Sequence, residues 1–209
     1  MMKLSELAAH TGASTASLKF YLREGLLPPG EAVHATLADY GQRHVDRVEM
    51  IRALRSVAGL SIGALRGVVE RIDVGDPLEL LGYVQAAVLG LDQDAVDAPA
   101  SDPAADALEA RHGWGGPGGA AHAALRAQLA LMRSLGAEPV PGRLDVYARA
   151  VQQIAEADLA TSLRTAGERG LEQMVIEAAT AMHLQNGLLV RMLAVAQASQ
   201  AGRRFGAEQ

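Results

Sequence analysis

The chain has 209 residues, enough for one large or two small domains with a buried core. Apolar residues make up 49% and charged residues 21%, which is ordinary for a globular protein in water. There is no Cys, which excludes disulfides and every thiolate metal or redox site.

The two parts of the chain differ in charge. Residues 1–72 carry nine Lys/Arg against seven Asp/Glu, whereas residues 73–209 carry ten against seventeen. A mildly basic first part on an acidic remainder is compatible with nucleic-acid binding by the first part alone. The opening residues MMKLSELAAH are too polar for a signal peptide, and no apolar run approaches the roughly 18 residues of a membrane helix. We therefore expect a cytoplasmic protein that does not associate with membranes.

The first residues predict two short helices joined by a turn. LSELAAH places its leucines on one face, and TGAS at residues 11–14 ends this helix. Ser14 is a suitable N-cap for a second helix over residues 15–24, and Gly25 suits the position just after it. A Pro-Pro-Gly run at residues 28–30 then forces a non-helical excursion.

The remainder reads as helix almost throughout. AVHATLA, residues 32–38, is the one place where a short β-ribbon is expected. Helices are predicted over residues 39–57, from the N-cap Ser61 to residue 72, and over residues 76–94, where the start DPLE joins an N-cap Asp to a Pro at N1.

Two breaks separate this part from the last helices. Residues 97–107 have the composition of a linker, and the Gly-rich HGWGGPGG at residues 112–119 is a second break. Helices are expected at 120–135, 143–167 and 170–201. No internal repeat with a fixed period is present.

The first two helices fit a helix-turn-helix, in which the second helix enters the major groove of DNA. Leu18 and Leu22 would face inward, while the cations Lys19 and Arg23 would neutralise phosphate charge. The alternative from local features is a small helical hairpin with a solvated charged face.

The stretch KLSELAAHTGASTASLKFYLREGLLPPG resembles the start of the MerR family of bacterial transcription regulators. Relatives show an ELA-like first helix, a TG turn, a recognition helix ending in Arg-Tyr-Tyr or Arg-Phe-Tyr, and an EGLL-like turn. The match continues through Tyr40, His44, Ile51, Arg52, Leu54 and GLSIGAL, and covers about residues 2–72.

The resemblance implies a set of DNA contacts. Lys19 stands where relatives usually have Arg, which keeps the charge but loses bidentate geometry. Phe20 stands at a Tyr-or-Phe position, and Tyr21 keeps the family's Tyr. The predicted DNA-binding residues are Ser14, Thr15, Ser17, Lys19, Phe20, Tyr21, Arg23, His34, Thr36, Tyr40 and Arg43.

The wing departs from the family pattern. Relatives have Gly-Tyr-Arg before the Tyr that matches Tyr40, whereas this chain has Thr-Leu-Ala-Asp at residues 36–39. The wing Arg is therefore missing, and we expect a lower affinity or a shifted wing, with His34 and Thr36 as weaker phosphate contacts.

Other chemistry has little support. The six His lack the spacing of a helical metal site, the Gly-rich break lacks GK[ST], and no catalytic pattern is present, so we expect no metal, no cofactor and no enzyme. Core packing is the simplest interpretation of the Met residues of the last helix, and a Met-lined effector pocket is the alternative. The candidate effector-binding residues are Trp114, Tyr147, Met174 and Met182.

The predicted fold is all-α in three parts. Residues 1–74 form a winged helix-turn-helix domain, residues 75–97 a linking or dimerisation helix, and residues 98–209 a helical effector or partner domain. A short seam, spaced as in a coiled coil, is the predicted dimer contact; it comprises Leu81, Val84, Val88 and Leu91.

We predict a homodimeric regulator that binds a palindromic promoter site on double-stranded DNA. The resemblance implies activation by bending and untwisting an overlong promoter spacer, with RNA polymerase as a further partner and a non-metal effector; repression stays equally open. The competing hypothesis is a protein-interaction adaptor whose C-terminal domain binds another protein while the head tethers it to DNA. An adaptor should show an exposed apolar patch, and a ligand sensor a concave apolar pocket.

Overall fold

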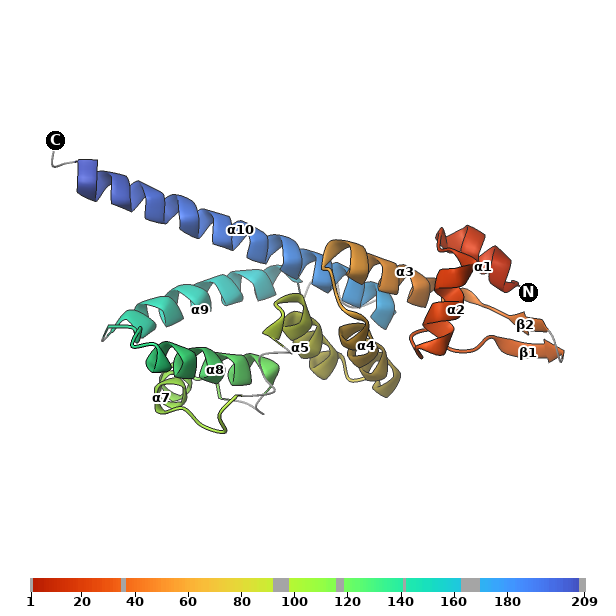
Figure 1. Cartoon of the computed structure of the whole chain (residues 1–209), viewed down its shortest axis with the longest axis horizontal. Coiled ribbons are helices and arrows are strands. Elements are labelled where there is room, and N and C mark those ends of the chain that lie inside the picture. The colour runs from red at the N-terminus through yellow and green to blue at the C-terminus, as the bar shows by residue number, and fades with distance from the viewer. Residues whose placement is uncertain are drawn as a thin grey trace.

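The computed structural model describes residues 2–34, 37–91, 98–115, 119–140, 142–162 and 170–206. Within these ranges it contains nine helices and one two-stranded antiparallel sheet (Figure 1). The predicted all-α class is therefore confirmed. None of the helices in these ranges has both the length and the apolar composition that crossing a membrane requires.

The first 74 residues, called the head below, contain four helices and the sheet. Their bounds are α1 Leu4–Thr11, α2 Thr15–Arg23, β1 Glu31–His34, β2 Leu37–Asp39, α3 Gln42–Val57 and α4 Ile62–Val74. The predicted ribbon is confirmed, and its register pairs Glu31 with Asp39 and Ala32 with Ala38. The third helix was predicted to begin at Asp39; it begins at Gln42, because Asp39 is held in the ribbon.

The next helix, α5 Pro77–Val88, starts as the DPLE pattern predicts. The Asp76 side chain accepts hydrogen bonds from the amides of Leu78 and Glu79 at 2.9 and 3.2 Å. The helix was predicted to continue to residue 94, but it ends at Val88, and residues 92–94 lie outside the described residues. Gly90 follows with a φ of 71°, a left-handed conformation that ends helices and favours glycine.

The C-terminal part contains four more helices in the described ranges: α7 Pro103–His112, α8 Ala120–Ser134, α9 Arg143–Ser162 and α10 Leu171–Gly206. The predicted linker at residues 97–107 is wrong for its second half, because α7 begins at Pro103. Asp102 caps that helix by accepting hydrogen bonds from the amides of Ala104 and Ala105. Of the predicted helix at residues 143–167, the part after Ser162 lies outside the described residues.

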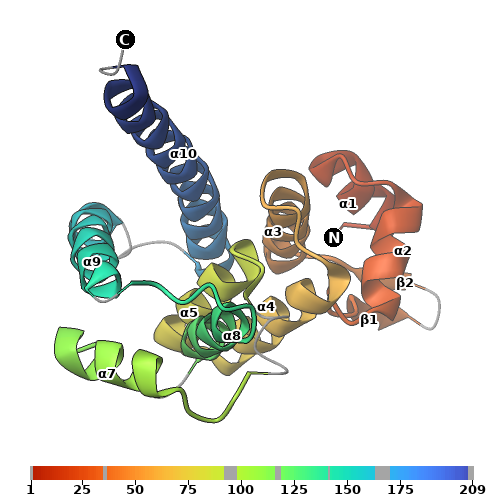
Figure 2. The same ribbon diagram turned by 60° about the vertical axis from the view of Figure 1, so that its left-hand side comes forward.

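The main hydrophobic core lies in the head and includes residues from far along the chain. Leu18, Ile51 and Leu65 are fully buried together with Val175 and Ala179 of α10. The first half of α10 packs on α3 and α5, and α5 packs on α4 (Figures 1 and 2). The core of the head is therefore closed by a helix that begins about 100 residues later in the sequence.

The second half of α10 has a different environment. It extends away from the rest of the molecule in both ribbon views (Figures 1 and 2). Every residue from 190 to 204 is exposed, and we call this segment the α10 arm. The helices α7, α8 and α9 form a separate group, called the body below, which covers residues 98–162.

Candidate nucleic-acid interface

The second helix of the head presents one polar, exposed face. Thr15, Lys19 and Arg23 are four residues apart, so they lie on the same side of α2, and all three are exposed. Ser14 caps the helix by accepting a hydrogen bond from the Ser17 amide at 3.0 Å. Two cations on one exposed helix face suit a phosphate backbone, as the sequence predicted for this helix.

The two adjacent aromatic residues of α2 have different environments. Phe20 is half-buried, and the Arg23 guanidinium carbon lies 5.4 Å from its ring centroid, a cation–π contact. Tyr21 is only 4% exposed and belongs to the head core. Its ring therefore forms little of the surface that a DNA contact needs, whereas Phe20 holds Arg23 in place on the exposed side.

The angle between α1 and α2 is fixed by a turn that requires glycine. Gly12 has a φ of 64°, and a Cβ there would lie 3.1 Å from Nη1 of Arg52. Arg52, on α3, donates a hydrogen bond to the Thr11 carbonyl at the end of α1. A side chain at residue 12 would thus be strained by its backbone and would crowd the Arg52 contact.

The end of α2 is also well defined. Gly25 has a φ of 72°, and its amide donates to the Leu22 carbonyl at 3.3 Å. The Leu26 amide donates to the Tyr21 carbonyl at 2.9 Å, which completes a Schellman motif. The prediction of Gly25 as the residue after the helix is confirmed, and the turn directs Leu26 and Leu27 into the core.

The wing is anchored at its base. The Tyr40 amide donates to the Met2 carbonyl at 3.0 Å, and the Met2 amide donates to the Asp39 carboxylate. Gly30 allows this close packing, because a Cβ there would lie 2.9 Å from the Asp39 carbonyl oxygen. Tyr40 is buried, with its ring edge-on to His44, so it contributes to the base of the wing rather than to an exposed surface.

Two predicted wing contacts cannot be placed. Thr36 and the side chain of His34 lie outside the described residues. Their contacts, like those predicted for the recognition helix, stay predictions.

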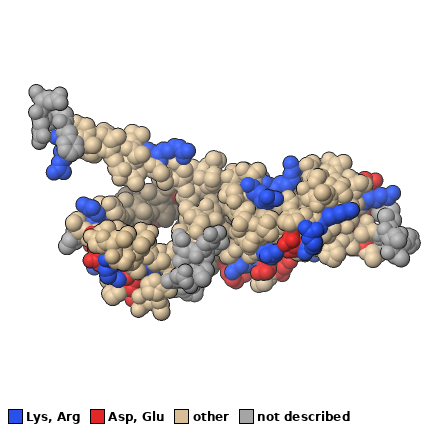
Figure 3. Space-filling model, viewed as in Figure 1, with Lys and Arg blue, Asp and Glu red and all other residues tan. Residues whose placement is uncertain are grey.

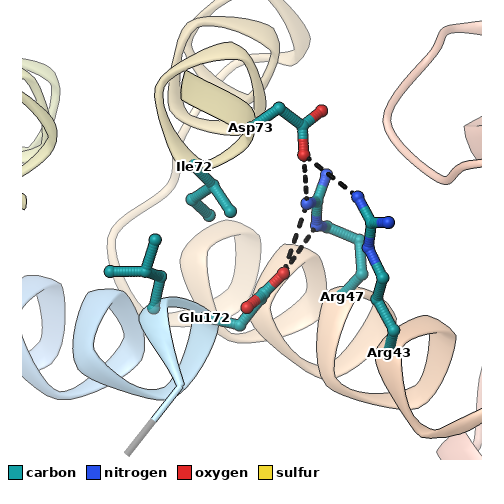
Figure 4. A pocket seen from close by; sticks show the side chains of 6 residues that line it. Arg43, Arg47, Ile72, Asp73 and Glu172 are labelled. Carbon is teal, nitrogen blue, oxygen red and sulfur yellow. Dashed lines mark hydrogen bonds and ion pairs between the residues drawn. The ribbon is translucent and has the colours of Figure 1, made fainter. Parts of the chain in front are cut away.

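At the start of α3, four charged side chains form a cluster. Arg47 is 1% exposed; its Nη2 lies 3.0 Å from Asp73 Oδ1 and its Nε lies 3.2 Å from Glu172 Oε1. Arg43 Nη2 reaches the same Asp73 oxygen at 3.3 Å, and its side chain is 66% exposed. The cluster lines a cavity of about 300 Å³ between α3, α4 and the first turn of α10 (Figure 4).

This cluster joins the head to the C-terminal helix. Arg47 lies on α3, Asp73 on α4 and Glu172 on α10, so one buried guanidinium connects three elements. The sequence reasoning missed Arg47. A signal was present, because Arg47 is three residues after the buried His44 and four before Ile51, on the inward face of its helix.

The charges of the head are unevenly spread over its surface. In the view of Figure 3, Lys and Arg side chains gather over the head, and acidic side chains lie along its lower edge. Arg43 is one of the cations of the head, and it forms an ion pair with Asp73. Its predicted DNA contact therefore competes with this ion pair.

The four candidate effector-binding residues are not brought into one cavity. Met174 and Met182 pack against the head core, which agrees with the simpler interpretation of the Met residues. That interpretation is wrong for Met192, which is 58% exposed because it lies on the part of α10 beyond the head. Trp114 donates from Nε1 to the side-chain oxygen Oε1 of Gln152 at 2.6 Å, and Tyr147 on α9 is exposed. A second cavity of about 190 Å³ lies between α7 and α9 and contains none of the four.

Polar contacts hold the body together. Burial raises the pKa of Asp102. The hydrogen bond from the Ala105 amide and the Arg133 guanidinium, 2.9 Å away, lower this pKa by more than burial raises it, so the net pKa is below its usual value. The Arg111 guanidinium likewise holds the pKa of Asp145 below its usual value. Among the described residues, no three His, Asp or Glu side chains converge as metal ligands would.

The predicted dimer seam is used within the chain itself. Val84 is fully buried in the head core, and Val88 packs against that core. Leu81 is half-buried, and Leu91 lies beyond the end of α5. Val84 and Val88 thus pack within the chain itself, so the structure offers little of the middle of this seam to a partner.

The arrangement of α1, α2, the two-stranded wing and α3 defines a winged helix-turn-helix domain, a class of DNA-binding domain. Residues 2–72 match the family model described as "MerR HTH family regulatory protein". The N-terminal domain is therefore of the MerR helix-turn-helix type, and this match covers about a third of the chain.

Two individual proteins are similar to this chain. The HTH-type transcriptional regulator AdhR of Bacillus subtilis (strain 168) is 36% identical over 64 residues, which cover 31% of this chain and 45% of AdhR. The match thus spans less than half the length of this relative. The crystal structure of SCO5550 from Streptomyces coelicolor A3(2), described as a candidate transcriptional regulator, covers 98% of both chains with 27% identity and a TM-score of 0.57.

Proposed function

We propose that this protein is a transcriptional regulator that binds promoter DNA through α2 and the wing. The observation that carries the proposal is the exposed row Thr15, Lys19 and Arg23 on a helix capped by Ser14, within a MerR-type domain. The finer mechanism follows the family: two copies on a palindromic site bend and untwist the promoter, in contact with RNA polymerase. The proposed site of action is the cytoplasm, on the nucleoid.

The wing in this proposal has a minor role. The described wing residues include no Lys or Arg, so phosphate contacts depend mainly on α2 and on the start of α3. The binding should therefore be weak for its class and steeply salt-dependent, because each neutralised phosphate releases counterions.

A footprint on the DNA upstream of the protein's own gene, at two salt concentrations, is the first test. We expect a protected palindrome that weakens as salt increases. Failure there and in a screen of random duplexes, at low salt, would contradict the proposal.

The residue-level test is Lys19→Ala against the control Arg149→Ala, an exposed cation on α9. On the duplex that the footprint identifies, Lys19→Ala should lower the affinity and reduce the slope of log affinity against log salt by about one. Arg149→Ala should leave both unchanged. Equal behaviour of the two variants would exclude the docking of α2 proposed here.

One observation favours the adaptor as a second candidate. Large apolar side chains are exposed on α9 and α10, including Tyr147, Leu188 and Leu193, whereas the two cavities described above are small and flanked by ion pairs. An exposed apolar surface points to a macromolecular partner more than to a small-molecule effector. The regulator and the adaptor differ in what covers this apolar surface: a second copy of the chain in the regulator, and another protein in the adaptor.

A further inference from the structure

One cation lies at the base of the wing. Residues 24–42, which include the whole wing, contain no Lys or Arg, so Arg43 is the first cation after α2 along the chain. Arg43 is the second residue of α3, three residues after Tyr40, and its side chain is 66% exposed. In the proposed function, Arg43 is therefore the cation that can bind a phosphate beside the wing.

Arg43 already has a partner in the chain. Its Nη2 lies 3.3 Å from Oδ1 of Asp73, near the end of α4, and both side chains are at least half exposed. An ion pair exposed to this degree is weak and is screened by salt, so a phosphate can replace the carboxylate. The pair restrains Arg43 without fixing it.

The same carboxylate oxygen binds a second arginine. Asp73 Oδ1 also accepts a hydrogen bond from Nη2 of Arg47 at 3.0 Å (Figure 4). Unlike Arg43, Arg47 is only 1% exposed and cannot reach a phosphate. A buried guanidinium without a carboxylate is strongly destabilising, so the fold must keep a carboxylate beside Arg47 whatever Arg43 binds.

The second carboxylate beside Arg47 comes from the start of α10, at the opposite end of this helix from the α10 arm. Oε1 of Glu172 lies 3.2 Å from Nε and Nη2 of Arg47, and the Glu172 side chain is 15% exposed. With Glu172 in place, two carboxylates face two guanidiniums, and Asp73 is shared between both arginines (Figure 4). Without Glu172, Asp73 alone must balance the buried charge of Arg47, and less of its charge is left for Arg43.

We propose that the docked start of α10 is an autoinhibitory contact for DNA binding by Arg43. Because Glu172 neutralises Arg47, Asp73 remains available to hold the exposed arginine back from DNA phosphate. When the first turn of α10 leaves the head, Asp73 is drawn to Arg47, and Arg43 becomes available to the duplex. The inference rests on the proposed function, because it requires Arg43 to face the duplex.

This arrangement couples the C-terminal part of the chain to the DNA interface. A ligand or protein that binds better to the chain with this turn displaced raises the affinity of the head for DNA, and DNA favours the displaced turn in return. The coupling needs no movement of α2, whose position is fixed by the core of the head.

The first test removes the charge of Asp73 in the full chain. On the duplex that the footprint identifies, Asp73→Asn should bind about fivefold more tightly than wild type, because Arg43 gains a phosphate, and the slope of log affinity against log salt should become steeper by about one. Glu70→Gln is the matched control, because it removes a charge from an exposed residue one turn earlier on α4. It should change the Kd by less than about twofold.

A double-mutant cycle assigns the gain to Arg43. In the Arg43→Ala background, Asp73→Asn should no longer tighten binding, because the side chain that it releases is missing. A gain of the same size in that background would mean that the charge of Asp73 acts on DNA directly, and would overturn the inference.

Glu172→Gln tests the contribution of α10. Arg47 keeps only Asp73 in this variant, so binding should tighten by about threefold, again only while Arg43 is present. Circular dichroism at the temperature of the binding assay shows that each variant is folded. Binding by folded Glu172→Gln that is unchanged or weaker would exclude control by the start of α10.

The outcomes separate the inference from the proposed function. If Lys19→Ala weakens binding while Asp73→Asn and Glu172→Gln bind as wild type does, the head binds DNA as proposed and the inference is wrong. If even Asp73→Asn binds no duplex at low salt, both the inference and the proposed function are wrong.

Discussion

The head and the body of this molecule are both helical but are stabilised differently. The head buries large side chains throughout, including Leu18, Met50, Ile51 and Leu65. Among the described residues of the body, the buried apolar side chains are mostly alanines, with Leu108 and Leu129 as the large ones. Ion pairs such as Asp102–Arg133 and Arg111–Asp145 join its helices.

The difference shows where rigidity is concentrated. A DNA-reading helix must be held at a fixed angle, and the head achieves this with a dense core, two glycine turns and the Arg52 contact to the end of α1. The body has less apolar area to bury, so its packing should be weaker and more sensitive to pH. The following predictions test this comparison.

The largest effect should come from a cavity in the head. Ile51→Ala should reduce the free energy of unfolding of the head by about 2–5 kcal/mol, because Ile51 is fully buried among large side chains. Leu108→Ala should cost the body about 2 kcal/mol or less, because Leu108 lies at the edge of a cavity. Circular dichroism in urea follows all the helices, whereas the fluorescence of Trp114, the one Trp of the chain, follows the body.

The two probes decide whether head and body unfold independently. Ile51→Ala should shift the main dichroism transition and leave the Trp114 transition in place. If both probes shift together in both variants, head and body form one cooperative unit and the comparison fails.

The second effect concerns the connection between α10 and the head. Glu172→Gln removes one of the two carboxylates that neutralise the buried Arg47, and should reduce the free energy of unfolding by about 1–3 kcal/mol. Glu79→Gln is the matched control, because Glu79 pairs with Arg71 in an exposed position where ion pairs contribute about 1 kcal/mol or less. Equal effects in urea unfolding would mean that the Arg47 cluster contributes no more than a surface pair.

The local structure of the head could be predicted from sequence because its signals are local. Ser14, Gly25 and DPLE are capping patterns whose meaning depends on a few neighbouring residues, and each was confirmed. The same rule would have found the start of α7, since Ser-Asp-Pro at residues 101–103 combines an N-cap with a Pro at N1. The prediction instead followed the composition of residues 97–107, which is typical of a linker.

What could not be predicted depends on contacts between distant residues. The periodicity of Val84 and Val88 shows a helix that packs on another helix, but not which one. The partner is α10 of the same chain, about 90 residues later, together with α4. Arg47 is similar, because its role follows only from the carboxylates of Asp73 and Glu172 that the fold brings to it. For the candidate DNA contacts, the spacing of residues 15, 19 and 23 was enough to predict that they share one exposed face. The burial of Tyr21 and Tyr40 became clear only from the structure.

A third prediction concerns pH and the body. The pKa of Asp102 is lowered in the folded state, so its contribution to stability is complete above the pKa of an unfolded Asp, about 3.9, and is lost as the pH falls through the lower folded value. Asp102→Asn keeps a capping side chain for α7 but removes the charge beside Arg133. Between pH 6 and pH 3, the urea midpoint from Trp114 fluorescence should fall less in Asp102→Asn than in wild type. The same pH dependence in both proteins would show that Asp102 is not the group responsible.

The smallest effect separates capping from DNA contact. Ser14 and Ser61 cap α2 and α4 with the same hydrogen bond, to the amide three residues on, at 3.0 and 3.1 Å. Replacing either by Ala should cost about 1 kcal/mol in the free energy of unfolding. Only Ser14 lies at the start of the proposed recognition helix, so Ser14→Ala should also weaken DNA binding, whereas Ser61→Ala should not. If both variants bind DNA as wild type does, the start of α2 does not approach the duplex. If both variants weaken DNA binding equally, the loss of affinity comes from the lower stability of the head. Only a difference in affinity between the two variants can be assigned to a contact of Ser14 with DNA.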